Sequence, residues 1–205
     1  MSLQNRCVLI VGCGISGIGA AEILYKTGAK PILFDANTSL KKEDIEKKLP
    51  IDIKAEIVIG TMSKELEDQV SLVVLSPGVP SDSEFALQFK KRNIEVWGEV
   101  ELAYHFTKGK VIAITGTNGK TTTTALTGQI MKDYFDSVFV VGNIGNAYTK
   151  EALNTKQDSV TVAEISSFQL ETIHSFKPNI SAILNITPDH LNRHHTMENY
   201  AAVKE

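Results

Sequence analysis

One local pattern occurs twice in the chain: an apolar, β-branched run, a glycine-rich loop, and then a stretch with helical spacing. The first copy joins the run at residues 7–11 to Gly12-Cys13-Gly14-Ile15-Ser16-Gly17. The second joins the run at residues 111–114 to Thr115-Gly116-Thr117-Asn118-Gly119-Lys120-Thr121-Thr122. Because parallel strands need a crossover, usually a helix, this alternation predicts the α/β class with parallel sheets.

The expected elements fall into two domains. In the first half, we expect further strands at 31–34, 57–59 and 72–75, and helices near 17–27, 43–48 and 83–92. In the second half, we expect a helix at 120–134, strands at 138–141, 160–165 and 180–184, and a last helix from Met197. We assign residues 1–93 to a Rossmann-like domain, 94–109 to a joint with a short strand and a helix, and 110–205 to the first part of a P-loop-type ATPase domain.

The end of the sequence has helical spacing without a stop signal at residues 201–205. We therefore expect an N-terminal fragment with a truncated second domain. An incomplete sheet is expected to expose the apolar faces of residues 160–163 and 180–184.

Charge and composition exclude several classes of protein. The 205 residues include 21 Lys and Arg against 24 Asp and Glu, a net charge of −3 that predicts no basic face for nucleic acid. No apolar run approaches the roughly 18 residues of a membrane helix, and the polar start lacks a signal-peptide pattern. We expect a cytoplasmic monomer with no nucleic-acid or membrane partner. Cys7 and Cys13 match neither a disulfide framework nor a zinc site, and are expected to be packed thiols.

The first glycine loop has the G-x-G-x-x-G pattern between a strand and a helix. In this setting, backbone N–H groups and the helix N-terminus hold a phosphate. Asp35 ends the next strand, where such folds place an acid that contacts a ribose or base. Gly78, in Ser76-Pro77-Gly78, belongs to a loop at the same sheet edge. From the residues alone, the loop fits NAD, another nucleotide, or a tight turn without a ligand.

The second glycine loop is typical of a phosphate-binding P-loop. Its backbone N–H groups would face a polyphosphate, Lys120 would reach the outer phosphates, and the Thr121 hydroxyl would bind Mg²⁺. A regular P-loop has a glycine five positions before Gly119, where this chain has Ile114, so we expect a shortened variant. The alternative is a turn that is merely rich in small residues.

Polar residues also follow three later strands of the second half. Glu164 ends the run at 160–163, Asn143 follows the run at 138–141, and Asp189-His190 follows the run at 180–184. We expect Glu164 and His190 to converge on the P-loop, where a carboxylate suits a hard cation. A competing hypothesis is a transition-metal pair of His190 and His194, which have zinc-helix spacing but no convincing third ligand. The other histidines, at 105, 174, 194 and 195, are expected to face solvent.

Together and in this order, these motifs resemble the Mur ligase superfamily. The resemblance rests on residues 12–17, 76–78, 98–102, 115–122, 142–145, 164–171 and 185–193. The Ser-Ser-Phe-Gln-Leu run and Asn118 resemble the D-glutamate-adding member rather than the alanine- or diaminopimelate-adding members. The resemblance implies an ATP-dependent amide (C–N) ligase that adds D-glutamate to UDP-N-acetylmuramoyl-L-alanine through an acyl phosphate, in peptidoglycan precursor synthesis, with ATP and Mg²⁺ as cofactors.

The resemblance also implies roles for individual residues. The implied sets are Gly14, Ile15, Ser16, Asp35, Gly78 and Asn143 for the UDP-substrate; Gly116, Thr117, Asn118, Gly119, Lys120, Thr121, Thr122 and Thr123 for ATP; Thr121, Glu164, His190 and Lys204 for Mg²⁺; and Lys120, Glu164, His190 and Lys204 for catalysis. Lys204 matches the family lysine that is carbamylated. Asn37 and Asn192 depart from residues that many relatives carry. The family's amino-acid-binding domain would lie beyond residue 205, so the fragment alone is expected to be inactive.

Two other functions remain open at this point. An NAD-dependent oxidoreductase would explain residues 12–35 but leaves the P-loop and Glu164 without a role. A non-catalytic nucleotide-binding fragment would use both loops without turnover. Folylpolyglutamate synthases share the P-loop style but lack the first glycine-loop domain.

Overall fold

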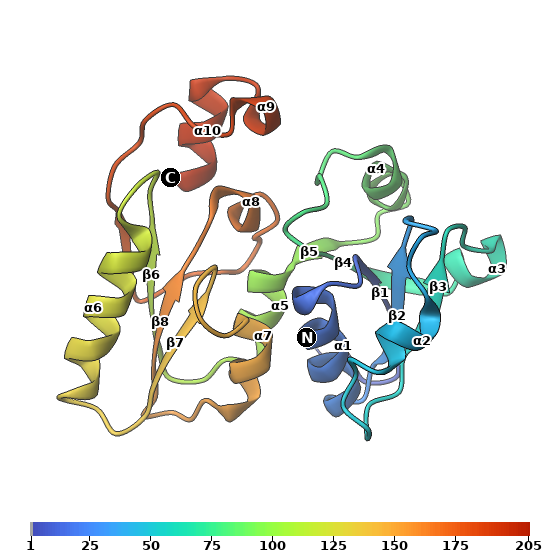
Figure 1. Cartoon of the computed structure of the whole chain (residues 1–205), viewed down its shortest axis with the longest axis horizontal. Coiled ribbons are helices and arrows are strands. Elements are labelled where there is room, and N and C mark those ends of the chain that lie inside the picture. The colour runs from blue at the N-terminus through green and yellow to red at the C-terminus, as the bar shows by residue number, and fades with distance from the viewer. Residues whose placement is uncertain (1) are drawn as a thin grey trace. The chain divides into compact units, whose positions relative to one another are not determined.

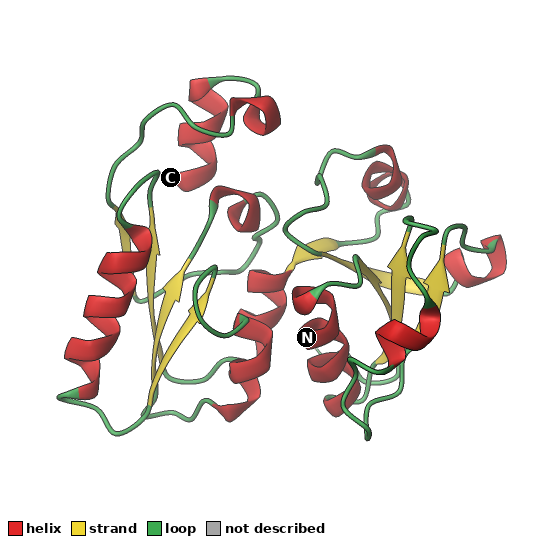
Figure 2. Cartoon of the chain, in the orientation of Figure 1, coloured by secondary structure: helices red, strands yellow, loops and turns green. Residues whose placement is uncertain are grey.

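The computed structural model describes residues 2–205, which form two compact units divided between Leu102 and Ala103. Both units are α/β, with a parallel sheet and helical crossovers (Figure 1, Figure 2). Helix α5 (Glu99–Phe106) contains the division. The α/β fold class predicted from the sequence is confirmed.

The first unit has a five-stranded sheet. Its elements are β1 (Cys7–Val11), α1 (Ile15–Lys26), β2 (Lys30–Asp35), α2 (Lys42–Glu46), β3 (Glu56–Ile59), α3 (Lys64–Glu67), β4 (Val70–Leu75), α4 (Glu84–Lys91) and β5 (Val96–Gly98). The strand order is β3-β2-β1-β4-β5, and every pair is parallel. Burial on both faces explains why these strands are continuous apolar runs rather than alternating ones.

From β1 the chain adds β2 and β3 on one side of the sheet, and it then adds β4 and β5 on the other side, so β1 and β4 are neighbours. The loops that follow these two strands therefore meet at one carboxyl edge, the place where open parallel sheets bind ligands. The backbone N–H of Ser76 donates to Val11 O at 3.0 Å, so the Ser76-Pro77-Gly78 loop begins beside the first glycine loop.

The second unit has a four-stranded parallel sheet in the order β7-β8-β6-β9. Its elements are β6 (Lys110–Thr115), α6 (Lys120–Lys132), β7 (Val138–Gly142), α7 (Tyr148–Glu151), the 3₁₀ helix η1 (Ala152–Asn154), β8 (Val160–Glu164), α8 (Ser167–Leu170), β9 (Ile180–Ile183), α9 (Leu191–His194) and α10 (Met197–Lys204). Helix α6 packs beside β6, β7 and β8. The core between them includes Ile112, Ile114, Val160 and Val162.

The predicted strands coincide with observed ones to within two residues at each end, but helices α3, α7, α8 and α9 were not predicted. The expectation of exposed apolar residues at 160–163 is wrong, because β8 lies between β7 and β6 and Val162 is fully buried. At the sheet edge, Ile180 and Ile183 of β9 are 58% and 42% exposed, as expected. Within residues 2–205, none of the helices is both long enough and apolar enough to cross a membrane.

Candidate functional site

The first glycine loop needs glycine at two of its positions for steric reasons. Gly12 has φ +102°, and a Cβ there would lie 2.7 Å from Ser76 Oγ. A Cβ on Gly17 would lie 1.9 Å from the carbonyl oxygen of Gly12. Gly14 differs, because a Cβ at that position would meet nothing within 4 Å. The turn therefore depends on Gly12 and Gly17, while the loop is open to solvent at Gly14.

Asp35 holds this loop in place at the end of β2. Its Oδ2 accepts the backbone N–H of Cys13 at 3.1 Å, and its Oδ1 accepts that of Asn37 at 3.0 Å. Burial and the Asp35 carboxylate raise the pKa of the Cys13 thiol to about 12, so Cys13 packs as a neutral thiol.

A cavity of about 470 Å³ opens beside Gly12 and Asp35. Its apolar lining includes Phe34, Met62 and Val79. An apolar wall next to a carboxylate is a chemistry that suits a nucleobase.

The other predicted substrate residues lie in two places. Gly14, Ile15 and Gly78 are exposed around the same edge of the first sheet. The Ser16 hydroxyl donates to Glu99 Oε2 at 3.0 Å, so its proton already has a partner. Asn143 lies in the second unit, on the loop after β7.

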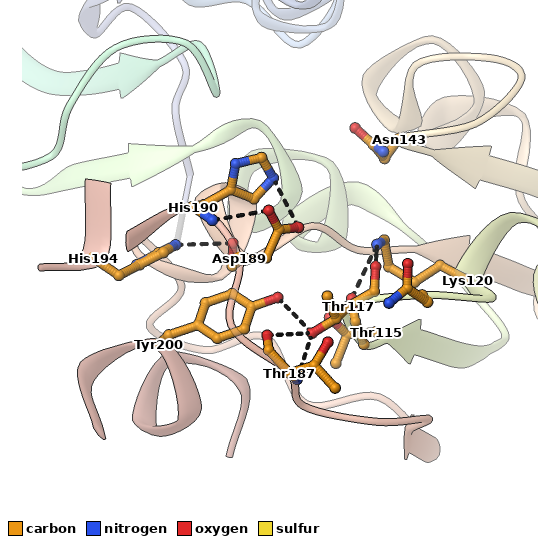
Figure 3. Close-up of polar contacts among 12 residues, drawn as sticks. Thr115, Thr117, Lys120, Asn143, Thr187, Asp189, His190, His194 and Tyr200 are labelled. Carbon is orange, nitrogen blue, oxygen red and sulfur yellow. Dashed lines mark hydrogen bonds and ion pairs between the residues drawn. The ribbon is translucent and has the colours of Figure 1, made fainter. Parts of the chain in front are cut away.

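The second glycine loop, residues 115–122, has the geometry of an anion cradle (Figure 3). Gly116 and Gly119 have φ of +149° and +82°, conformations that L side chains rarely adopt. The Lys120 Nζ folds over the loop and donates to Gly116 O and Thr117 O, both at 2.9 Å. Thr121 and Thr122 are exposed on the first turn of α6, and Thr123 is half-buried.

Residues after β9 hold the loop from its other side, and sequence reasoning assigned them no such role. Asn185 accepts the Asn118 N–H at 2.9 Å and donates to Asn118 O at 3.0 Å. The Thr117 hydroxyl donates to Thr187 O at 3.1 Å and lies 3.0 Å from the Tyr200 hydroxyl. Thr117 and Asn118 are thus engaged by the protein itself. The position of 185–187 directly after a strand was the available signal.

Glu164 is the buried acid at this edge. It lies in register with Ile114 and Gly142, at the carboxyl ends of three neighbouring strands. Its Oε1 accepts the Asn143 side-chain amide at 2.9 Å, whereas its buried Oε2 has no hydrogen-bond partner. A buried carboxylate oxygen without a partner is costly, and a cation would remove that cost.

Lys204 reaches the same loop from the end of α10. It is 6% exposed, and its Nζ donates to Thr115 Oγ1 at 3.1 Å and to Gly116 O at 3.3 Å. Burial, and to a lesser extent the positive charge of Lys120, lower the pKa of Lys204 to about 8. Two lysines therefore serve one short loop, an arrangement suited to a multiply charged anion.

His190 caps α9 in the left-handed conformation, with φ +51°. Its ring is half-exposed, and its Nε2 lies 3.4 Å from Asp189 Oδ2. The expectation that His194 faces solvent is wrong. His194 is 5% exposed, its Nε2 lies 2.9 Å from Ser167 Oγ, and burial lowers its pKa.

The competing hypothesis of a transition-metal pair, His190 and His194, is not supported by the structure. The His194 Nε2 is engaged by Ser167, and no group of three His, Cys, Asp or Glu side chains suited to a metal occurs in residues 2–205. The structure instead brings Lys120, Glu164, Asn143 and Lys204 to one edge of the second sheet.

Comparison with known proteins accounts for both units. Residues 6–98 match the model of the Mur ligase MurD-like N-terminal domain, and residues 114–205 match that of the Mur ligase middle domain. The chain belongs to the Mur ligase family. The two glycine loops of this Mur ligase chain thus fall in two different family domains.

Curated relatives match the chain over its whole length. Two are UDP-N-acetylmuramoylalanine--D-glutamate ligases, 62% identical in Lachnospira eligens and 60% identical in Lachnoclostridium phytofermentans. In each case the match covers 100% of this chain and 45% of the relative, so the chain spans about half the length of these relatives.

A solved structure supports the fold of this Mur ligase chain. The crystal structure of UDP-N-acetylmuramate-alanine ligase MurC from Thermotoga maritima has a TM-score of 0.53 and 20% sequence identity. That match covers 97% of this chain and 45% of the MurC chain.

Proposed function

We propose that this chain carries the nucleotide sites of an ATP-dependent ligase that joins D-glutamate to UDP-N-acetylmuramoyl-L-alanine. The observation that carries the proposal is the convergence of Lys120, Lys204 and Glu164, whose buried Oε2 has no hydrogen-bond partner, at the ends of β6 and β8. The names of the two curated ligases described above support the choice of substrates.

The chemistry begins with the low reactivity of a carboxylate, which resists attack by an amine because oxide is a poor leaving group. Transfer of the ATP γ-phosphoryl group to the substrate carboxylate gives an acyl phosphate. Lys120 and the backbone N–H groups at the start of α6 would stabilise the charge that develops on the transferred group. The amine of D-glutamate then attacks the acyl carbon, and inorganic phosphate leaves. No side chain of this chain is needed as a covalent nucleophile.

Mg²⁺ fits the residues at this edge. The buried Glu164 Oε2 lacks a hydrogen-bond partner and is the kind of hard oxygen ligand that Mg²⁺ prefers. The exposed Thr121, in the first turn of α6, is proposed to supply a hydroxyl oxygen as a second ligand. His190 is proposed as a further ligand, and Lys204 as a carbamate, since its lowered pKa makes the neutral amine available for CO₂. When bound, Mg²⁺ would neutralise phosphate charge during the transfer.

The first unit is proposed to bind the UDP part of the substrate. Asp35 would contact the uracil from the cavity beside Gly12, and the open backbone at Gly14, Ile15 and Ser16 would face the diphosphate. Because the Ser16 hydroxyl proton is donated to Glu99, Ser16 would contact a phosphate oxygen through its backbone N–H. Gly78 is also proposed to contact UDP in this unit. Asn143, in the second unit, is proposed as a separate contact to the substrate. A nicotinamide cofactor would leave the P-loop and Glu164 unused.

Phosphate release by the full-length protein tests the proposal. Release should require ATP, Mg²⁺, UDP-N-acetylmuramoyl-L-alanine and D-glutamate together, and Lys120→Ala should abolish it. Lys132→Ala is the matched control, since Lys132 is an exposed lysine in the last turn of the same helix. Release that is independent of D-glutamate, or unaffected by Lys120→Ala, would contradict the proposed function.

A further inference from the structure

We propose that Glu171, Arg193 and His194 form a largely buried clamp that positions His190 beside the P-loop. None of the three residues is needed as a ligand of ATP, substrate or metal in the proposed function, on which this inference rests. The clamp is a set of positioning residues rather than catalytic ones, and its effect should be measured at His190.

The centre of the clamp is a two-pronged ion pair. Arg193 Nε donates to Glu171 Oε1 at 3.0 Å, and Arg193 Nη2 donates to Glu171 Oε2 at 2.7 Å. The side chains are only 15% and 10% exposed. A bidentate pair of this kind fixes both distance and orientation, which a packed apolar pair would not.

His194 adds a second connection between the same two segments. Its Nε2 lies 2.9 Å from Ser167 Oγ, in α8, and its Nδ1 lies 3.6 Å from Glu171 Oε1. A proton on Nδ1 would face the Glu171 carboxylate, and Ser167 would then be the donor to Nε2. Helix α9 is thereby attached to α8 through both of its last two residues.

The segment that begins α8 follows directly after Glu164. Ser166 caps α8 in a reciprocal pair with Gln169, and Ser167 is the first residue of the helix. The clamp therefore connects the strand end that carries Glu164 to the short helix that His190 opens. Two of the proposed metal ligands are tied to each other through it.

His190 is restrained by its neighbour Asp189, 3.4 Å from its Nε2, and by contacts that involve the clamp residues. Helix α9 has four residues, and His190 caps it with a left-handed backbone. The His190 ring packs on Phe168 with centroids 4.8 Å apart. Phe168 in turn contacts the Arg193 guanidinium at 5.1 Å and stacks with His194 at 5.6 Å. Both the backbone and the ring support of His190 are therefore held by clamp residues.

Glu171→Gln in the full-length protein tests the clamp, because it removes the charge and keeps the shape. We expect Mn²⁺ affinity, measured by electron paramagnetic resonance with a non-hydrolysable ATP analogue, to fall about tenfold. The His190 ring resonances should shift, and kcat should fall without a matching rise in the KM for UDP-substrate. Glu171→Asp, which restores the charge, should recover part of each loss. Asp68→Asn is the control, since it breaks the exposed ion pair with Arg92 in the first unit.

Unchanged Mn²⁺ affinity together with unchanged His190 resonances in Glu171→Gln would overturn the clamp, even if the protein became less stable. Should that variant fail to fold, Arg193→Lys keeps the charge while removing the bidentate geometry, and the same readouts apply. If Lys120→Ala abolishes phosphate release and the clamp variants change nothing, this inference alone fails. If Lys120→Ala also leaves release intact, the proposed function fails.

Discussion

The ionisation of Lys204 depends strongly on its surroundings. Its pKa is lowered from 10.5 to about 8, so between these pH values the unfolded chain holds a proton that the folded chain has lost. Stability rises with pH wherever the unfolded state binds more protons. In protein free of metal and nucleotide, the Lys204 contribution to the free energy of unfolding should therefore increase as the pH rises from about 8 to 10.5. This increase should be absent in Lys204→Met.

Denaturant titrations of the wild type, Lys204→Met and Lys132→Met at three pH values measure this effect. Lys132 is exposed, so its removal should leave the slope with pH unchanged. Parallel curves for the wild type and Lys204→Met would contradict the lowered pKa.

Asp35 offers a second prediction at the scale of a single residue. Asp35→Ala removes the acceptor of the Cys13 and Asn37 N–H groups and the proposed contact to uracil. UDP binding should weaken by about 1–3 kcal/mol, the effect of losing a charged hydrogen-bond partner. Calorimetric titration with UDP measures it, with Asp44→Ala as the control because Asp44 is an exposed acid that pairs with Lys47 on the surface. Equal affinity in Asp35→Ala would remove Asp35 from the nucleotide site.

Sequence reasoning located single residues well where a strand determines their position. Asp35, Lys120 and Glu164 each follow an apolar run, and the carboxyl ends of parallel strands share one edge, so their placement was predictable. His194 was misjudged because spacing along a short helix does not say which side is covered. The partners Glu171 and Arg193 are 22 residues apart, and nothing local indicates that they meet.

At the scale of elements, the strand-to-helix turn of the first unit depends on Gly17. Gly17→Ala would force a Cβ to within 1.9 Å of the Gly12 carbonyl oxygen, so the turn must distort. We expect a loss of about 1–3 kcal/mol in stability, typical of overpacking, together with weaker UDP binding. Gly14→Ala is the matched control, because its φ is −80° and its Cβ has open space. Thermal unfolding measures both variants, and equal melting temperatures would contradict the steric argument.

The strands were predictable from their continuous apolar runs, and the longer helices from helical spacing that extends over two or more turns. The helices α3, α7, α8 and α9 have four residues each, about one turn, so no periodicity exists to detect. Their stability comes from caps and tertiary contacts, such as the Ser166–Gln169 capping box of α8. The exposure of β8 was misjudged because the order of strands in a sheet cannot be read from a single apolar run. In the structure β8 lies between β7 and β6, inside the sheet.

At the scale of the whole molecule, the two glycine loops belong to different units and should bind independently. UDP should raise the melting temperature of the chain, whereas NAD at the same concentration should not, because ligands stabilise by mass action. In Lys120→Ala, the shift with MgATP should disappear while the shift with UDP remains. Equal shifts with NAD and UDP would contradict the UDP assignment, and loss of the UDP shift in Lys120→Ala would contradict the separation of the two sites.

Transfer of oxygen from substrate to phosphate is the most direct test of an acyl phosphate formed at the P-loop. UDP-N-acetylmuramoyl-L-alanine labelled with ¹⁸O in its free carboxylate would be incubated with the full-length protein, ATP, Mg²⁺ and D-glutamate. If the carboxylate attacks the γ-phosphoryl group, one labelled oxygen must leave with inorganic phosphate, and mass spectrometry of the phosphate should show it. Amide product accompanied by unlabelled phosphate would contradict the acyl phosphate and the role proposed for Lys120.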